Sequence, residues 1–109
     1  MLLHNLNDMD SRERVPGFHS RMIHSDHMTF SVWDVEAEAA LPEHSHPHEQ
    51  ISTVLEGTFE LTVGGDTKSL QPGMVVVIPS DVPHSGKALT PCKMLDVFHP
   101  VREDFRSSE

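Results

Sequence analysis

The chain has 109 residues and a formal net charge of −9, from 17 acidic and 8 basic side chains. This length suits one domain around one core, which we expect over residues 1–109, with a loose N-terminal arm over 1–16 and a loose tail over 106–109. Lys and Arg form no cluster, so neither nucleic acid nor an anionic membrane surface is expected as a partner. Cys92 is the only cysteine, which excludes a disulfide framework and favours a reducing compartment.

The N-terminus lacks the features of a secretory signal. The segment Met1–Leu6 has no basic start and no long apolar run. No stretch approaches the roughly 20 apolar residues that a membrane-spanning helix requires. We therefore expect a cytoplasmic protein with no membrane partner.

Short β-strands are predicted along most of the chain. Residues 28–35 alternate between apolar and polar side chains, as a half-buried strand does, whereas 75–78 is a β-branched run typical of a buried strand. Glycine- and proline-containing turns separate the segments, and no long helix is indicated. The pattern predicts an all-β closed sheet or sandwich. Further strands are expected over 21–24, 51–55, 59–63, 67–70 and 93–98, with 36–41 a connection, 79–83 a rigid loop and 101–109 a polar tail.

A histidine-rich segment over residues 42–50 precedes one of these strands. Side chains two residues apart on a strand share a face, so His44 and His46 are expected to point the same way, with Gln50 at the same parity. A single metal ion needs further ligands, and His84 follows the rigid loop downstream. His48 is expected at the rim of such a site, and surface or packing roles are expected for His4, His19, His24, His27 and His99.

Two motifs resemble those of the cupin superfamily: His44-x-His46-x3-Gln50-x6-Gly57 and Gly73-x5-Pro79-x4-His84. The resemblance implies a cupin double-stranded β-helix, or jelly-roll, barrel, in which His44, His46, Gln50 and His84 bind one metal ion. The chain departs from the superfamily pattern at four positions. Glu38 and Asp81 stand where glycine is usual, Gln50 where glutamate is usual, and Ala88 where asparagine is usual.

A narrower resemblance, over roughly residues 38–105, is to the pectin degradation protein KdgF family. It rests on the segments 44–51, 54–57, 78–79 and 82–85, and most specifically on 95–105. Members of that family open the ring of unsaturated uronates released from pectin and alginate, and the product is a linear keto sugar acid. The resemblance implies that Asp96, Phe98 and Arg102 line the site.

Three imidazoles and one amide oxygen suit a borderline divalent ion such as Zn, Ni, Mn, Fe or Co. With open coordination positions, such an ion acts as a Lewis acid in a catalytic site. Asp96 is a general acid or base if its strand face is the inner one, and a strand-end carboxylate if it is not. Phe98 either stacks on the sugar or belongs to the core. Arg102 either pairs with the substrate carboxylate or holds a neighbouring acid at the surface.

These features together predict a metal-dependent enzyme that opens the ring of 4,5-unsaturated uronates. Asp96 and Arg102 would be catalytic, and Phe98 and Arg102 would bind the acidic sugar. Two alternatives remain open: a cupin dioxygenase with a redox metal and an enolic substrate, and a sugar- or metabolite-binding cupin without turnover. Because a small barrel exposes strand edges, N-terminal arms paired across a two-fold axis are expected to give a homodimer.

Overall fold

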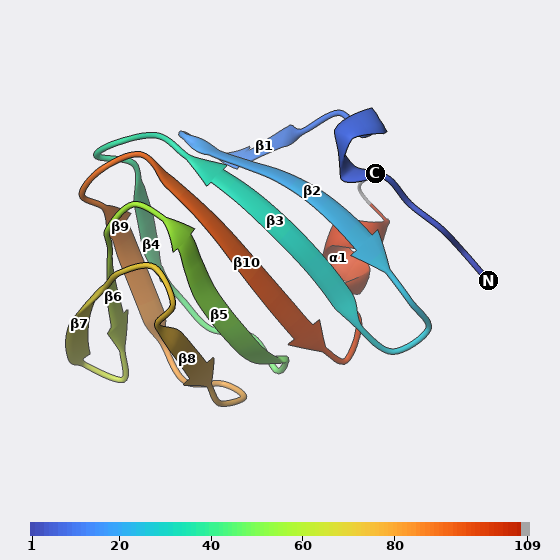
Figure 1. Cartoon of the computed structure of the whole chain (residues 1–109). Helices are drawn as coiled ribbons and strands as arrows, with labels where there is room; N and C mark the ends of the chain where they lie inside the picture. The colour runs from blue at the N-terminus through green and yellow to red at the C-terminus, as the bar shows by residue number, and fades with distance from the viewer. Residues whose placement is uncertain (108–109) are drawn as a thin grey trace.

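A computed structural model describes residues 1–107, which form two β-sheets and very little helix (Figure 1). The elements are η1 (Leu6–Asp8), β1 (Arg12–Val15), β2 (Phe18–His24), β3 (Thr29–Val35), β4 (Ala40–His44), β5 (Glu49–Glu56), β6 (Phe59–Val63), β7 (Asp66–Leu70), β8 (Val75–Ile78), β9 (His84–Ala88), β10 (Cys92–His99) and α1 (Glu103–Arg106). No helix among the described residues is long and apolar enough to cross a membrane.

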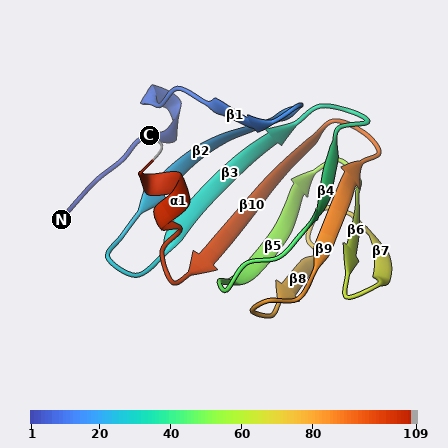
Figure 2. The ribbon, with the colours of Figure 1, turned by 180° about the vertical axis from the view of Figure 1, so that it is seen from behind.

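The strands form a six-stranded sheet, in the order β1-β2-β3-β10-β5-β8, and a four-stranded sheet, in the order β4-β9-β6-β7. All the pairings within the two sheets are antiparallel. The two sheets face each other, and α1 lies on the same side of the six-stranded sheet as the four-stranded one (Figure 2). The predicted all-β jelly-roll architecture is confirmed.

The core lies between the inner faces of the two sheets. Phe18 of β2 meets Phe59 of β6 edge to face, with 6.3 Å between the ring centroids. Val54 and Ile78 are fully buried, and burial of each such side chain contributes about 1.5–3 kcal/mol to stability. Cys92 is a free cysteine buried in this core.

The central strand β10 brings polar side chains into the barrel. It pairs with β3 on one side and with β5 on the other, so Asp96 lies opposite Ser31 and Ser52. Phe98, two residues further along the same face, lies opposite Gln50. Met94 and Phe98, on the same side of β10 as Asp96, are buried, so this side faces the inside of the barrel.

Two expected elements differ in the structure. The strand over 75–78 was expected to be buried, but the side chains of Val75 and Val77 are 61% and 58% exposed. β8 is the edge of its sheet, and a run of apolar residues does not by itself distinguish a buried strand from an edge strand. The prediction of a polar tail over 101–109 is also wrong for the described residues 101–107, since Val101 and Arg102 are buried and α1 follows them.

Two further segments, residues 84–88 and the N-terminal arm, contain strands. β9 is central in its sheet although it contains Gly86, where a Cβ atom would lie 2.3 Å from the Phe59 ring. In the N-terminal arm, β1 pairs with β2 of the same chain. Arg106, within the tail expected over 106–109, is the last residue of α1, and residues 108–109 lie outside the described part of the chain.

Candidate metal centre and its cavity

A cavity of about 360 Å³ lies inside the barrel and collects most of the polar residues named above. One part of its wall carries hydrogen-bonding and ionisable groups, namely Arg14, Glu43, His44, His46, Gln50, Ser52, His84, Asp96 and Arg102. The rest is apolar and is formed by Val15, Phe18, Trp33, Val35, Leu41, Pro42, Phe59, Leu61, Met94, Phe98 and Phe105. Apolar side chains thus make up more of the lining than polar ones do.

Three histidines converge in this cavity from three different backbone segments. His44 is the last residue of β4 and His84 the first of β9, and the two are cross-strand partners with ring centroids 4.2 Å apart. His46 lies in the connection between β4 and β5, with its ring 4.9 Å from that of His84. One ligand nitrogen of each histidine lies within 4.8 Å of the others. Alternation along one strand, the expected reason for this convergence, is wrong because β4 ends at His44.

Each of the three rings is fixed by its Nδ1 atom. Nδ1 lies 2.9 Å from the Pro42 carbonyl oxygen in His44, 3.0 Å from that of His48 in His46, and 2.9 Å from that of Val82 in His84. A carbonyl oxygen only accepts, so each Nδ1 must carry a proton and donate it. In the neutral ring this leaves Nε2 unprotonated, which is the form that binds a metal ion.

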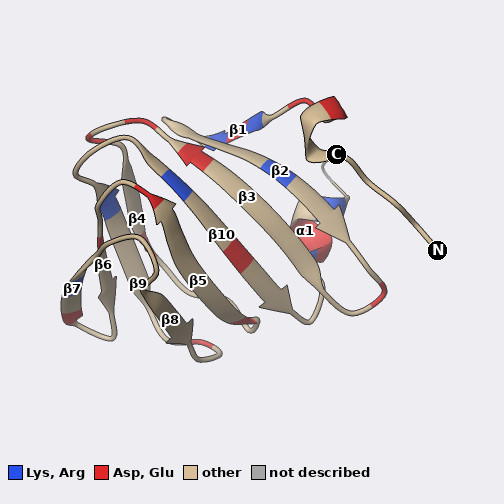
Figure 3. Cartoon of the chain, in the orientation of Figure 1, with Lys and Arg blue, Asp and Glu red and all other residues tan. Residues whose placement is uncertain are grey.

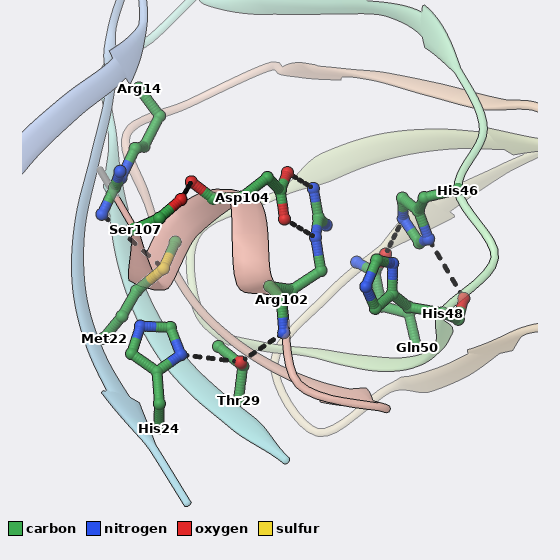
Figure 4. Close-up of polar contacts among 10 residues, drawn as sticks. All are labelled: Arg14, Met22, His24, Thr29, His46, His48, Gln50, Arg102, Asp104 and Ser107. Carbon is green, nitrogen blue, oxygen red and sulfur yellow. Dashed lines mark hydrogen bonds and ion pairs between the residues drawn. The ribbon is translucent and has the colours of Figure 1, made fainter. Parts of the chain in front are cut away.

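Gln50, near the start of β5, turns its amide toward His46 (Figure 4). Its Nε2 donates to Ser52 Oγ at 2.9 Å and to Asp96 Oδ2 at 3.2 Å. Its Oε1 therefore faces His46 Nε2, at 3.1 Å. Because His46 carries its proton on Nδ1 and donates it to the His48 carbonyl, its Nε2 is an acceptor. His46 Nε2 and Gln50 Oε1 are therefore two acceptors that face each other without a proton between them. A cation bound by both atoms would relieve this arrangement.

The remaining chemistry of the cluster also fits a divalent metal. His84 Nε2 is buried and has no hydrogen-bond partner among the described residues. Burial, with smaller effects from Arg102 and His84, lowers the pKa of His46 to about 4, and burial also lowers the pKa of His84. Both rings are thus neutral at pH 7, and imidazole with an amide oxygen suits borderline transition metals. The group His44, His46 and His84, with Gln50 beside it, is a candidate metal centre.

Asp96 points into the same cavity. Ser52 and Gln50 hydrogen-bond its carboxylate, while its Oδ1 is buried and has no hydrogen-bond partner among the described residues. Burial raises the pKa of Asp96 to about 6, although these hydrogen bonds and the charge of Arg102 act in the opposite direction. The sequence left open whether Asp96 faces the inside of the barrel or the solvent at a strand end, and in the structure it faces the inside.

Arg102 holds a neighbouring acid, which is one of the two roles expected for it, and it also lines the cavity. Its side chain is 10% exposed and lines the cavity, and its Nε and Nη2 donate to the Asp104 carboxylate at 3.0 Å and 2.9 Å (Figure 4). The guanidinium lies 4.8 Å from the centre of the Phe98 ring and 4.0 Å from that of Phe105, within cation–π range. Phe98 is itself buried and its ring also packs near His46, so it is a core residue that borders the cavity.

Sequence reasoning missed three residues at this site. Ser52 is buried and holds Gln50 and Asp96, while Arg14 and Phe105 meet at the cavity wall with the guanidinium 5.0 Å from the ring. The parity of Ser52 with Gln50 on β5 was an available signal. No comparable signal marked Arg14, which comes from the N-terminal arm.

The other histidines do not join the cluster. His48 lies in a neighbouring surface depression with Pro47 and Asp104, and its backbone carbonyl positions the His46 ring. His19 is outside the cavity, 3.0 Å from Glu36 and 3.5 Å from Glu13.

Comparisons with known proteins agree with this architecture. The cupin domain family model matches residues 31–98. The structure of KdgF from Halomonas sp. is 28% identical with a TM-score of 0.86, over 91% of this chain and 93% of that one. An RmlC-like cupin from Shewanella frigidimarina NCIMB 400 is also 28% identical, with a TM-score of 0.87 over 91% and 90% of the two chains.

More distant structures share the fold alone. A salicylate 1,2-dioxygenase from Pseudoaminobacter salicylatoxidans has a TM-score of 0.76 at 19% identity, over 79% of this chain and 27% of that one. No curated protein matches the sequence. The two facing sheets, the histidine cluster between them and the domain match over most of the chain lead to one conclusion: the chain belongs to the cupin family.

Proposed function

We propose that the protein is a metal-dependent enzyme that opens the ring of 4,5-unsaturated uronates to linear keto sugar acids. The observation that carries this proposal is that Asp96, Phe98 and Arg102 border the same cavity as the histidine cluster. The similarity to the KdgF structure, at 28% identity over nearly the whole of both chains, supports it.

His44, His46, His84 and Gln50 are the residues that would hold the metal ion. When bound, a divalent metal supplies a Lewis acid that polarises a carboxylate or sugar oxygen. Zn, Ni, Mn, Fe and Co all accept this ligand set, and ring opening requires no change in oxidation state.

The reaction itself is a pair of proton transfers around one bond cleavage. The anomeric hydroxyl loses its proton as the bond between the anomeric carbon and the ring oxygen breaks, and the released ring oxygen takes up a proton, which gives an aldehyde and an enol. The enol then loses its hydroxyl proton and gains one at carbon, which gives the ketone. Asp96 is the buried carboxylate placed to take and return a proton, through the Oδ1 atom that no described residue engages.

Arg102 would orient the substrate carboxylate. Asp104 already takes the Nε and Nη2 side of the guanidinium, so the acid of the substrate would meet Nη1 or displace Asp104. The contacts with Phe98 and Phe105 hold the guanidinium plane at the cavity wall and limit its rotation.

The direct test follows the near-ultraviolet absorbance of an unsaturated monouronate, whose conjugated double bond is lost when the ring opens and the enol ketonises. Metal-loaded protein is expected to accelerate the decay, and chelated protein is not. Asp96→Asn is expected to lower the rate by at least a hundredfold, while Asp34→Asn, on the outer side of β3, leaves it unchanged. Decay at the spontaneous rate with metal-loaded protein would reject the proposal.

The apolar lining of the cavity favours a second candidate, a cupin dioxygenase that acts on an enolic substrate. Phe18, Trp33, Phe59, Leu61 and Met94 offer few hydrogen bonds to sugar hydroxyls, whereas they suit a substrate with an apolar body. Oxygen consumption by iron-loaded protein with enolic acids distinguishes this candidate, since ring opening consumes no oxygen. If neither reaction occurs, a binding role without turnover is what remains.

A further inference from the structure

We propose that the cavity contains an apolar subsite beside the candidate metal centre, and that it binds a carboxylic acid whose apolar body is about the size of a phenyl ring. The acid group lies at the metal centre and the apolar body in the subsite. Five lining residues define the apolar subsite, namely Phe18, Trp33, Phe59, Leu61 and Met94. The proposal goes beyond ring opening, because it concerns what the cavity binds and requires no reaction.

Strand register divides the inner face of the six-stranded sheet into rows that run across the strands. Two rows near the end of β10 contain most of the polar side chains, namely Thr29, Phe98 and Gln50 in one and Ser31, Asp96 and Ser52 in the other. Two rows near the start of β10 are mainly apolar, namely Trp33, Met94 and Val54 in one and Phe18, Val35 and Cys92 in the other. Consecutive rows are two residues apart, so each lies about 7 Å from the next along the strands.

The inner face of the four-stranded sheet changes in the same way along its strands. His44 and His84 pair with each other where β4 ends and β9 begins. Two residues further along β9, Gly86 pairs with Leu41 on one side and with Leu61 on the other. The metal ligands of this sheet therefore lie at one end and its apolar cavity residues toward the other.

Contacts between the two sheets align their polar ends. The ring of His46 lies 5.7 Å from that of Phe98, and the ring of Phe18 lies 6.3 Å from that of Phe59. In Figure 2 the end of β10 and the start of β9 lie at the lower side of the molecule, while the start of β10 and the end of β9 lie at the upper side. The cavity is therefore polar at one end and apolar at the other.

Charged side chains of β10 reach the cavity only at its polar end. Asp96 is the acidic band in the middle of this strand (Figure 3), and it points into the cavity. Lys93 is nearer the start of β10, but it points outward and lines a separate depression with Asp34. Arg102, which would bind the acid group, lies 4.8 Å from the centre of the Phe98 ring and so belongs to the polar end.

The apolar subsite offers few hydrogen bonds to a ligand. The indole nitrogen of Trp33 is the one nitrogen or oxygen atom on the side chains that define it, and it donates to Ser31 Oγ at 2.9 Å. At the border of the cavity, Arg14 Nε donates to Ser20 Oγ at 3.1 Å, and the guanidinium lies over the Phe105 ring. A sugar hydroxyl placed in the subsite would lose hydrogen bonds to water and gain few in return, whereas an apolar group is stabilised by leaving water.

The test is isothermal titration calorimetry of the metal-loaded protein with two acids that differ only by a phenyl ring, propanoate and 3-phenylpropanoate. The ring is expected to strengthen binding by about tenfold or more, and tenfold corresponds to about 1.4 kcal/mol. Trp33 is the only tryptophan, so a change in its fluorescence reports that the ring has entered the subsite. Glucuronate, a saturated sugar acid, is expected to bind more weakly than 3-phenylpropanoate.

Leu41→Asn introduces an amide next to the apolar subsite, from a partly buried position on the edge strand β4. It is expected to weaken 3-phenylpropanoate binding by about fivefold or more and to leave propanoate binding nearly unchanged. Leu89→Asn is the matched control, because Leu89 is exposed and does not line the cavity, and it should change neither affinity. Circular dichroism establishes that each variant is folded, and Val15→Asn, beside Phe18, replaces Leu41→Asn if that variant is not.

A phenyl ring that adds less than tenfold, or an absence of binding by both acids, overturns the proposal. Tighter binding of glucuronate than of 3-phenylpropanoate also overturns it, as does an effect of Leu41→Asn no greater than that of Leu89→Asn. None of these acids has the unsaturated ring that opens, so the outcome is independent of the ring-opening assay. Ring opening without a preference for the phenyl ring removes this inference alone, and the converse result removes the ring-opening proposal alone.

Discussion

At the scale of single residues, Gln50 connects the candidate metal centre to Asp96. Its amide oxygen faces His46, and its amide nitrogen donates to Ser52 and Asp96. An ionised glutamate at this position could not donate these two hydrogen bonds. Gln50→Glu would also place a second carboxylate about 3 Å from Asp96 Oδ2, so the metal-free protein is expected to lose about 1–3 kcal/mol of unfolding free energy at pH 7. Urea unfolding in chelator measures this loss. Gln71→Glu, at an exposed position, is the control, and equal stability of the two variants would contradict the role given to Gln50.

Two residues that replace the usual motif glycines have left-handed backbone conformations. Glu38 has φ of 70° and Asp81 has φ of 64°, so both positions retain the conformation that favours glycine. The Asp81 backbone N–H also donates to the carbonyl of His46, which ties the loop before β9 to the connection that carries a candidate ligand. Asp81→Val is expected to lower the free energy of unfolding by about 1–2 kcal/mol and to weaken metal binding. Asp81→Gly is expected to leave the stability and the metal affinity nearly unchanged. Thermal unfolding with and without metal compares them, and equal stability of the Val and Gly variants would show that the conformation imposes no constraint.

At the scale of elements, the pair between Asp104 and Arg102 fixes the start of α1 beside the cavity. Hydrogen bonds from Arg102 lower the pKa of Asp104, so the folded state binds this proton less readily than the unfolded chain. The stabilisation is present above the unfolded-state pKa of about 3.9 and is lost as pH falls through the lower folded-state pKa. Asp104→Asn is therefore expected to lower stability by about 1 kcal/mol near pH 7, with the difference from wild type disappearing in acid. Urea unfolding as a function of pH measures this stability difference, and Glu103→Gln on the same helix is the control. A difference that does not change with pH would contradict the stabilising role of the pair between Asp104 and Arg102.

At the scale of the whole molecule, the candidate metal centre joins the two sheets. His44 and His84 belong to the four-stranded sheet and Gln50 to the six-stranded one, so a metal ion bound by all of them cross-links the barrel. Metal that binds only the folded state is expected to stabilise it by about 2.7 kcal/mol at a hundredfold excess over Kd. Differential scanning calorimetry with added metal and with chelator measures this shift. His44→Ala should abolish the shift and His99→Ala, at an exposed position, should retain it; a shift unaffected by His44→Ala would place the metal elsewhere.

Much of the barrel and of its candidate site was predictable from sequence patterns. The strand over 28–35 and the shared face of Asp96 and Phe98 reflect the two-residue repeat of a strand, which is a local property. The repeat did not decide which face points inward, since the polar Thr29 and Ser31 are the buried side chains of β3 and the position of Asp96 was left open. The spacing of His44, His46, Gln50 and His84 is typical of cupins, and the structure places all four around one cavity. The exposure of β8, the strand β9 and the burial of Arg102 were not predictable in this way, because each depends on a partner distant in sequence.

The sequence by itself therefore determined the class of fold, the family and the four candidate metal ligands, since these follow from periodicity and motif spacing. Only the tertiary structure decided how those residues act on one another. Register and sheet order decide that His44 pairs with His84 and that Gln50 hydrogen-bonds Asp96. They also decide that Arg102 lies where it can donate to Asp104, and that one face of the six-stranded sheet has exposed apolar side chains. Register and order are set by which apolar faces pack together across the whole chain, and no local pattern specifies them.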